Sequence, residues 1–187
     1  MKKSILGTND FCPQTLFVFG THLADGKPNF GLFCWLSYFW DGELGVMAAI
    51  GGGKTTRDRI KATKVFSANL VTEEMLPLAD YFGNKNALPS EKIPAYDVEK
   101  GQVLDVPVLA QSPWVFELEV MQSIEMNDGE VFLCKVRNVL AEEFLTDETL
   151  SAEERINKIR PVSTTCMTYF NRNGTVAGNW GEPMKTF

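Results

Sequence analysis

The apolar residues of this chain fall into short runs separated by turn-forming residues, which is typical of β-strands joined by tight connections. Three of the connections contain an Asp-Gly pair, at residues 25–26, 41–42 and 128–129. The runs that these pairs separate are residues 15–22 and 29–40, residues 29–40 and 44–50, and residues 113–126 and 130–141. Because Asp-Gly between two apolar runs is a strong hairpin signal, each pair predicts two antiparallel strands.

The same runs predict how the strands are buried. Residues 29–40 are apolar on both faces, so they are expected to form one long buried strand. Residues 115–120 and 131–136 alternate between apolar and polar side chains, which predicts one wet face for each strand. On this pattern the carboxylates of Glu117 and Glu119 point into solvent and are not a pair for acid–base catalysis.

Three segments have helical character: residues 56–65, 72–82 and 149–159. A threonine is expected to cap the first, at Thr55 or Thr56, and Thr72 the second. Residues 84–100 are polar and rich in turn-forming residues, so they are expected to form a loop on the surface. Hairpin-linked strands with a few short helices predict a mainly β fold, a β-barrel with flanking helices. With no repeat or linker, residues 1–187 are expected to be one domain.

Composition and charge narrow the classes of function. The net charge is −6, with 18 basic and 24 acidic residues, so binding to nucleic acid is not expected. The most apolar stretch, residues 30–40, is too short to span a membrane, and no signal peptide is recognised, so a cytoplasmic location is expected. Four widely spaced cysteines and one histidine predict reduced core thiols and no metal site.

A glycine-rich segment, residues 51–57 (GGGKTTR), lies between a predicted strand and a predicted helix. Backbone N–H groups, a helix N-terminus, Lys54 and threonine hydroxyls are the parts that a phosphate site needs. The segment does not match the nucleotide-triphosphate loop, because Ala48 stands where that motif requires glycine. The alternative that stays open is a flexible connection with an exposed lysine.

The aromatic segment at residues 29–37 (NFGLFCWLS) could line a slot for a flat ligand, although a plain buried strand is the alternative. It is longer than a core strand needs, and the glycine-rich segment follows it by one hairpin. A ligand with a planar ring and a phosphate would bridge the two. No set of side chains in the sequence is suited to hydrolysis, so no catalytic residue is assigned; chemistry carried by a bound cofactor would need none.

Several segments follow one another in a recognisable order: residues 25–29 (DGKPN), Cys34-Trp35, residues 50–54 with Thr56, residues 60–83 and residues 103–113. In this order, from about residue 13 to residue 144, the chain resembles the flavin reductase-like family. Within that family it resembles the flavoredoxin-type proteins, whose fold is the FMN-binding split barrel. The resemblance implies FMN across one open end of the barrel, with FAD as the alternative flavin.

Nine residues are implied as cofactor-binding: Asn29, Leu32, Cys34, Trp35, Leu36, Lys54, Thr56, Lys92 and Tyr169. In the family, the strand segment 32–36 runs beside the isoalloxazine ring, and the residues matched by Lys54 and Thr56 hold the phosphate. Tyr169 resembles a tyrosine that approaches the flavin of the partner subunit. Leu32 stands where many members have a hydroxyl residue, and the glycines before Lys54 replace a common arginine.

The resemblance implies a flavin reductase or flavoredoxin-like oxidoreductase, and family members are usually homodimers. NAD(P)H or a protein donor would reduce the flavin, and the electrons would pass to a small or protein acceptor. One alternative is a non-enzymatic flavin- or tetrapyrrole-binding electron carrier. Another is a split-barrel oxidase acting on a pyridoxine phosphate, which would need a more basic pocket. No nicotinamide fingerprint is present to choose NADH or NADPH.

Overall fold

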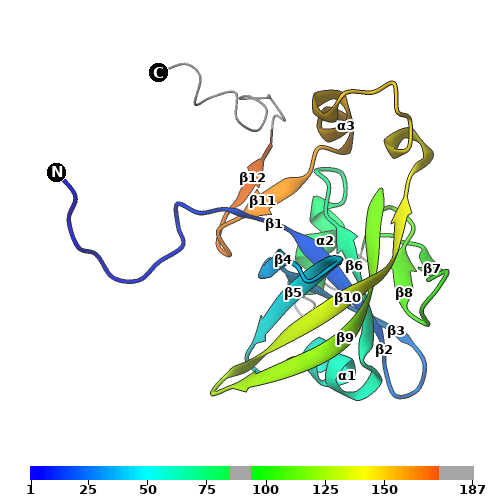
Figure 1. Cartoon of the computed structure of the whole chain (residues 1–187), viewed down its shortest axis with the longest axis horizontal. Coiled ribbons are helices and arrows are strands. Elements are labelled where there is room, and N and C mark those ends of the chain that lie inside the picture. The colour runs from blue at the N-terminus through cyan, green and yellow to red at the C-terminus, as the bar shows by residue number, and fades with distance from the viewer. Residues whose placement is uncertain (85–93, 173–187) are drawn as a thin grey trace.

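Seven antiparallel strands form the main sheet in the computed structural model, which describes residues 1–84 and 94–172 (Figure 1). Across the sheet they are β3 (Pro28–Phe33), β2 (Phe17–His22), β6 (Val65–Leu70), β9 (Trp114–Met126), β10 (Gly129–Ala141), β5 (Leu44–Gly51) and β4 (Leu36–Trp40). The three predicted hairpins are confirmed as β2–β3, β4–β5 and β9–β10. Gly26 and Gly42 have φ of 83° and 75° in their turns, values that favour glycine.

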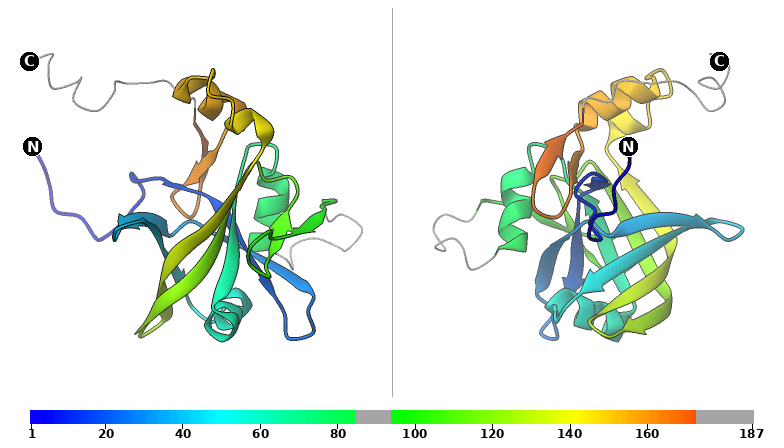
Figure 2. Two further views of the ribbon diagram at one scale, coloured as in Figure 1. Left: turned by 45° about the vertical axis from the view of Figure 1, so that its right-hand side comes forward. Right: turned by 90° about the vertical axis from the view of Figure 1, so that its left-hand side faces the viewer.

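The strand predicted over residues 29–40 is wrong in two respects. The structure divides it into β3 and β4, and β4 is largely exposed, with Tyr38 53% and Trp40 76% exposed, so it is not buried on both faces. These strands lie at opposite edges of the sheet, although only Cys34 and Trp35 separate them in the chain. The sheet is therefore rolled, as the two views in Figure 2 show. No strand pairing joins β3 to β4 among the described residues. The predicted mainly β fold with flanking helices is confirmed, and the described sheets are not closed into a barrel, as expected of a split barrel.

Smaller elements surround the main sheet. β1 (Gln14–Thr15), β11 (Val162–Thr164) and β12 (Tyr169–Asn171) form one small sheet, and β7 (Val98–Lys100) pairs with β8 (Pro107–Leu109). The helical segments are α1 (Thr55–Thr63), α2 (Leu76–Gly83), η2 (Glu143–Leu145) and α3 (Ala152–Ile159). In Figure 1, α1 lies at one end of the rolled sheet, and α3 lies with β11 and β12 at the other. None of the described helices has the length and apolar character needed to cross a membrane.

The predicted helix starts are corrected by the structure. Lys54, not a threonine, stands at the N-cap of α1, and its side chain makes no capping bond. α2 begins at Leu76, four residues later than predicted, because Thr72 Oγ1 accepts a hydrogen bond from the Met75 amide in a separate turn. α3 begins after Ser151, where Ser151 and Glu154 form a reciprocal capping box.

The core is divided between the two faces of β2. Phe17 and Phe19 point into the roll, where they pack with Phe66, Phe132 and other buried side chains, including Ile60 of α1. Leu16 and Val18, on the other side, pack under α2 with Phe30 and Phe82. Both faces of this strand are therefore buried, which explains why residues 15–22 show no alternation of polar and apolar side chains.

Glu117 is the main exception to the predicted wet faces, because its side chain is 0% exposed. Backbone amides of Gln102, Val103 and Leu104 donate to its carboxylate at 3.0, 3.0 and 2.6 Å, and Asn138 Nδ2 donates at 2.8 Å. Burial alone would raise the pKa of Glu117, but these four hydrogen bonds outweigh it and hold the pKa below its usual value. The carboxylate thus anchors the loop between β7 and β8 to β9.

We predict that Glu117→Gln lowers the free energy of unfolding by about 1–3 kcal/mol, because the amide cannot accept all four bonds and one of its N–H groups meets backbone donors. In the wild type, stability from the carboxylate is complete above the unfolded pKa near 4.5 and is lost as the pH falls through the lower folded value. Urea unfolding between pH 3 and 7 measures this. The free energy of unfolding should fall with decreasing pH in the wild type, and it should fall less in Glu117→Gln.

Glu119→Gln is the matched control, because Glu119 lies on the same strand, partly exposed, and pairs with Arg137 on the surface. Loss of this surface ion pair should lower the free energy of unfolding by less than about 1 kcal/mol. Equal urea midpoints for the wild type and Glu117→Gln would contradict the anchoring role.

Candidate functional site

A cavity of about 570 Å³ opens where the chain crosses from β3 to β4. Its walls come from this crossing, the end of β5 with the following loop, the β9–β10 turn and the small β1–β11–β12 sheet. The lining residues are Leu16, Leu32, Phe33, Cys34, Trp35, Ala49, Gly51, Gly52, Lys54, Asp128, Thr164, Cys166 and Tyr169. The volume is in the range of small-molecule and cofactor sites, which are typically apolar with a few placed polar groups.

A second cavity, of about 260 Å³, adjoins the first and is lined mainly by β3, the start of α1 and the end of α2. Leu32, Phe33 and Lys54 line both cavities. The predicted residues Asn29 and Thr56 line only the smaller one. The aromatic strand thus meets the glycine-rich segment around Lys54. In the sequence, one predicted hairpin separates these two segments.

The glycine-rich loop is held in place by hydrogen bonds on both sides. Gly52 N–H donates to the Asp128 carbonyl at 3.1 Å, and Arg57 Nη1 donates to the Gly52 carbonyl at 2.7 Å. Gly52 has φ of 70°, a conformation that other residues rarely adopt. These contacts disfavour the alternative of a flexible connection. The loop delivers exposed Lys54 to the N-terminus of α1, where the helix dipole is positive.

Asn29 and Thr56 position this helix against the aromatic strand. Asn29 Nδ2 donates to Thr56 Oγ1 at 3.0 Å and to Thr21 Oγ1 at 3.1 Å, and all three side chains are buried. Both predicted residues therefore lie next to Lys54, and their hydrogen bond joins β3 to the first turn of α1.

The other predicted residues divide into three groups. Leu32, Cys34 and Trp35 line the larger cavity, and a Cβ added to Gly51 would lie 3.2 Å from the Trp35 ring, so glycine allows this close approach. Leu36 lines neither cavity, because its side chain points into the roll and is buried in the core. Lys92 lies outside the described residues.

Tyr169 reaches the larger cavity from β12. Its hydroxyl donates to Asp80 Oδ1 of α2 at 2.6 Å. Burial, then the hydrogen bond to Asp80 and the negative charge of Asp80, raise the pKa of Tyr169 above its usual value, so the phenol stays protonated. The hydrogen bond also ties β12, and with it one wall of the cavity, to α2.

Sequence reasoning missed several lining residues, among them Leu16, Asp128, Thr164 and Cys166. Asp128 reaches the site because β10 pairs with β5, so that Gly129 lies opposite Gly51. A long-range pairing of this kind leaves no local signal. Thr164 and Cys166 belong to the small sheet, whose strands are too short to stand out in the sequence. Phe33, in contrast, is adjacent to the predicted Leu32 and could have been included.

Comparison with solved structures shows that the fold is a known one. Flavoredoxin of Desulfovibrio vulgaris (Miyazaki F) is 20% identical with a TM-score of 0.81, covering 98% of this chain and 100% of that one. Flavoredoxin from Methanosarcina acetivorans is 21% identical with a TM-score of 0.81, covering 100% and 99%. The FMN-binding protein from Thermus thermophilus is 17% identical with a TM-score of 0.73, covering 96% and 97%.

A search of the curated proteins gave no match to this sequence. The model of the flavin reductase like domain, in contrast, matches residues 10–173. This range includes every strand and helix described above. The chain therefore belongs to the flavin reductase-like family, and its function is a flavin-related redox function.

Proposed function

We propose that the two adjoining cavities bind FMN and that the protein is a flavin-dependent oxidoreductase, reduced by NAD(P)H or a protein donor. The observation that carries the proposal is the shape of the site: an apolar wall for a flat ring meets a glycine-rich loop and Lys54 for a phosphate. The printed names of the structural neighbours, flavoredoxins and an FMN-binding protein, support the choice of flavin.

The phosphate end of the proposed site is the start of α1. Lys54 supplies a positive charge, and the first amides of a helix have no partner within the helix. The hydroxyl of Thr56 lies within the same cavity as Lys54. These groups fit a dianionic phosphate, and a flavin lacking the phosphate would lose this interaction.

The ring end is the crossing between β3 and β4. Leu32, Phe33 and Trp35 give an apolar surface against which an isoalloxazine ring can pack. Bound there, FMN would supply the hydride and electron chemistry. The residues of this chain would orient the ring and exclude water, and no side chain of the site is required as nucleophile or base.

We propose further that the protein is a homodimer. Met47, Ala49, Val131, Leu133 and Ile124 share one outer face of β5, β10 and β9, as their cross-strand registers show. Met47 and Ile124 are 41% and 44% exposed, and none of the described helices packs on this face. Exposed apolar surface of this kind is typical of an interface.

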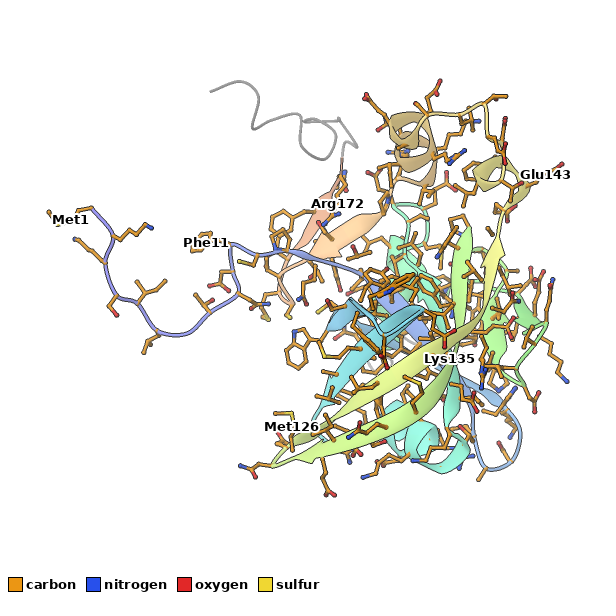
Figure 3. The ribbon with its side chains drawn as sticks, viewed as in Figure 1. Met1, Phe11, Met126, Lys135, Glu143 and Arg172 are labelled. Atoms are coloured by element: carbon orange, nitrogen blue, oxygen red, sulfur yellow. The ribbon has the colours of Figure 1, made fainter. Side chains whose placement is uncertain are left out.

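A second copy is the occupant that best fits this face. Ala49 belongs both to the face and to the wall of the large cavity, so the cavity opens at the border of the face. A partner packed there would also cover the exposed side of Trp35. Figure 3 shows that the face extends along the β9–β10 hairpin toward Met126 at its tip, which gives a long strip for contact.

The first test is the visible spectrum of the purified protein, before and after incubation with FMN. We expect a yellow protein that releases FMN on heating, in near-equal ratio to chains, and oxidises NAD(P)H when an acceptor is added. Release of FAD in place of FMN would show that FAD is the bound flavin. Bound flavin without NAD(P)H turnover would favour a carrier reduced by another protein. A protein that stays colourless with FMN would refute the site.

Lys54→Ala should weaken FMN binding by about 1–3 kcal/mol, roughly 5- to 150-fold in Kd, because one charge-assisted contact with the phosphate is lost. Flavin fluorescence titration of the apoprotein measures this. Riboflavin, which lacks the phosphate, should bind the wild type and the variant equally. Lys27→Ala is the control, since Lys27 is exposed in the β2–β3 turn. An unchanged Kd for FMN would show that Lys54 does not bind the phosphate.

Met47→Glu should convert the dimer to a monomer, because it places a carboxylate in an apolar interface without a partner. Sedimentation velocity of the wild type and the variant at the same concentration measures the change. Val98→Glu serves as the control, because Val98 is an exposed apolar residue of β7, away from this face. A monomeric wild type, or a dimeric Met47→Glu variant, would contradict the proposed interface.

A further inference from the structure

Two cysteines that are 132 residues apart in the sequence meet in the wall of the large cavity. The Sγ atoms of Cys34 and Cys166 are 3.4 Å apart, and both residues are free thiols that line the cavity. The other two cysteines do not share this position: Cys134 is buried in the core, and Cys12 is exposed near the N-terminus and does not line the cavity.

Each thiol is placed by the local backbone. Cys34 is one of the two residues that cross from β3 to β4, and its carbonyl accepts a hydrogen bond from the Leu36 amide at 2.9 Å. Cys166 lies in the turn between β11 and β12 with φ of 72°, an uncommon conformation for a residue with a side chain. Its amide donates to Thr164 Oγ1 at 3.0 Å, and Thr164 Oγ1 donates to the Thr168 carbonyl at 2.9 Å.

The two thiols differ in their access to solvent. Cys166 is exposed, and its Sγ has one further polar contact, from Asn9 Nδ2 at 3.8 Å. Cys34 is half-buried, and burial, with a further contribution from Cys166, raises its pKa to about 12. The exposed thiol can therefore meet a solvent oxidant first, and the half-buried thiol lies beside it, 3.4 Å from its sulfur. This is the arrangement of an attacking and a resolving cysteine.

We propose that Cys34 and Cys166 are a redox-active thiol pair that a hydroperoxide converts to an intrachain disulfide. The proposal goes beyond the proposed flavin chemistry and does not depend on it, because the thiols meet without any cofactor. The contact in the reduced protein is short enough that a small shift of the β11–β12 turn brings the sulfurs to bonding distance.

The reaction balances with hydrogen peroxide as oxidant. Cys166 first releases its thiol proton to solvent, and the thiolate then attacks one peroxide oxygen. The O–O bond breaks, and the hydroxide that leaves takes up a proton from solvent to give water. The sulfur of Cys34 then attacks the sulfenic acid on Cys166, an S–S bond forms, and a second water leaves with the proton of Cys34. Two thiols lose two electrons in total, and the peroxide is reduced to two molecules of water.

The disulfide would join the β11–β12 turn to the crossing between β3 and β4. Both segments are walls of the large cavity, so oxidation would fix the two walls relative to each other. A link across 132 residues also constrains the unfolded chain, which should raise the Tm by roughly 5–15 °C.

The test treats the full-length, flavin-free protein with hydrogen peroxide at a small molar excess and then quenches free thiols with an alkylating agent. We expect the loss of two of the four thiols per chain, and a non-reduced peptide map in which Cys34 is linked to Cys166. Dithiothreitol should restore both thiols and the original Tm. Because flavin is absent, a failure of FMN binding leaves this result unaffected.

Matched variants separate the proposal from its alternatives. Cys12→Ser keeps both members of the pair and should oxidise like the wild type, although it removes another exposed thiol. Cys34→Ser should show no intrachain disulfide and no rise in Tm, and its Cys166 should instead accumulate as sulfenic acid, detectable with a dimedone probe. A link between Cys12 and Cys166, a disulfide between two chains, or four thiols that stay free would each overturn the proposal.

Discussion

The structure depends on a constraint of topology: β3 and β4 are consecutive in the chain but occupy opposite edges of the sheet. Only Cys34 and Trp35 lie between them, and the chain from Phe33 to Leu36 can reach roughly 10 Å at full extension. The two edges must therefore approach, and the sheet must roll. Trp35 O accepts the Ala49 amide at 2.8 Å, which ties the crossing to β5. The phenylalanine core inside the roll follows from this crossing.

The same crossing explains why one cavity combines an apolar wall with a glycine-rich loop. β4 and β5 form a hairpin, so the end of β5 and the loop that follows it come back beside the crossing. Trp35 can then lie against Gly51, where a side chain would be crowded. Lys54 follows three residues later and reaches both cavities. The proximity of the two segments in the sequence was thus a correct guide to their proximity in space.

The sequence predicted local structure well where short-range chemistry decides it. The Asp-Gly hairpins are confirmed because their turns need only a few residues and a glycine. The break at Cys34-Trp35 could not be predicted, because both residues also suit a buried strand. The cap of α1 was wrong for a related reason: Thr56 Oγ1 is used as the acceptor of Asn29, a partner 27 residues away. Of the predicted site residues, Leu36 lies in the core because it pairs with buried Ala48 on the inner face of the sheet, whereas Trp35 lies beside Ala49 at the cavity.

Glu117 shows why patterns of alternation fail at such positions. A carboxylate every second residue predicts a wet face, but the burial of each side chain depends on what packs over the strand. Here the loop after β7 supplies three backbone N–H donors. The Glu117 carboxylate accepts their hydrogen bonds, and the loop in turn shields the carboxylate from solvent. Neither partner would be stable there alone, and the sequence contains no local sign that they meet.

Buried polar contacts perform the same task around the cavity, where elements outside the main sheet must be held to it. Asn29 joins β3 to α1, and Asn69 joins β6 to β8 through the Leu109 amide. Tyr169 joins β12 to α2, but the turn between β11 and β12 is held mainly by contacts within itself. The walls made by β3 and α1 are therefore joined by buried side-chain bonds. In the wall that holds Cys166, β11 is paired with β1 and Tyr169 is bonded to Asp80, while the turn between β11 and β12 is closed by its own hydrogen bonds. The two sulfurs therefore meet at a turn whose shape is set by its own hydrogen bonds, next to a crossing that is tied to β5 through Trp35.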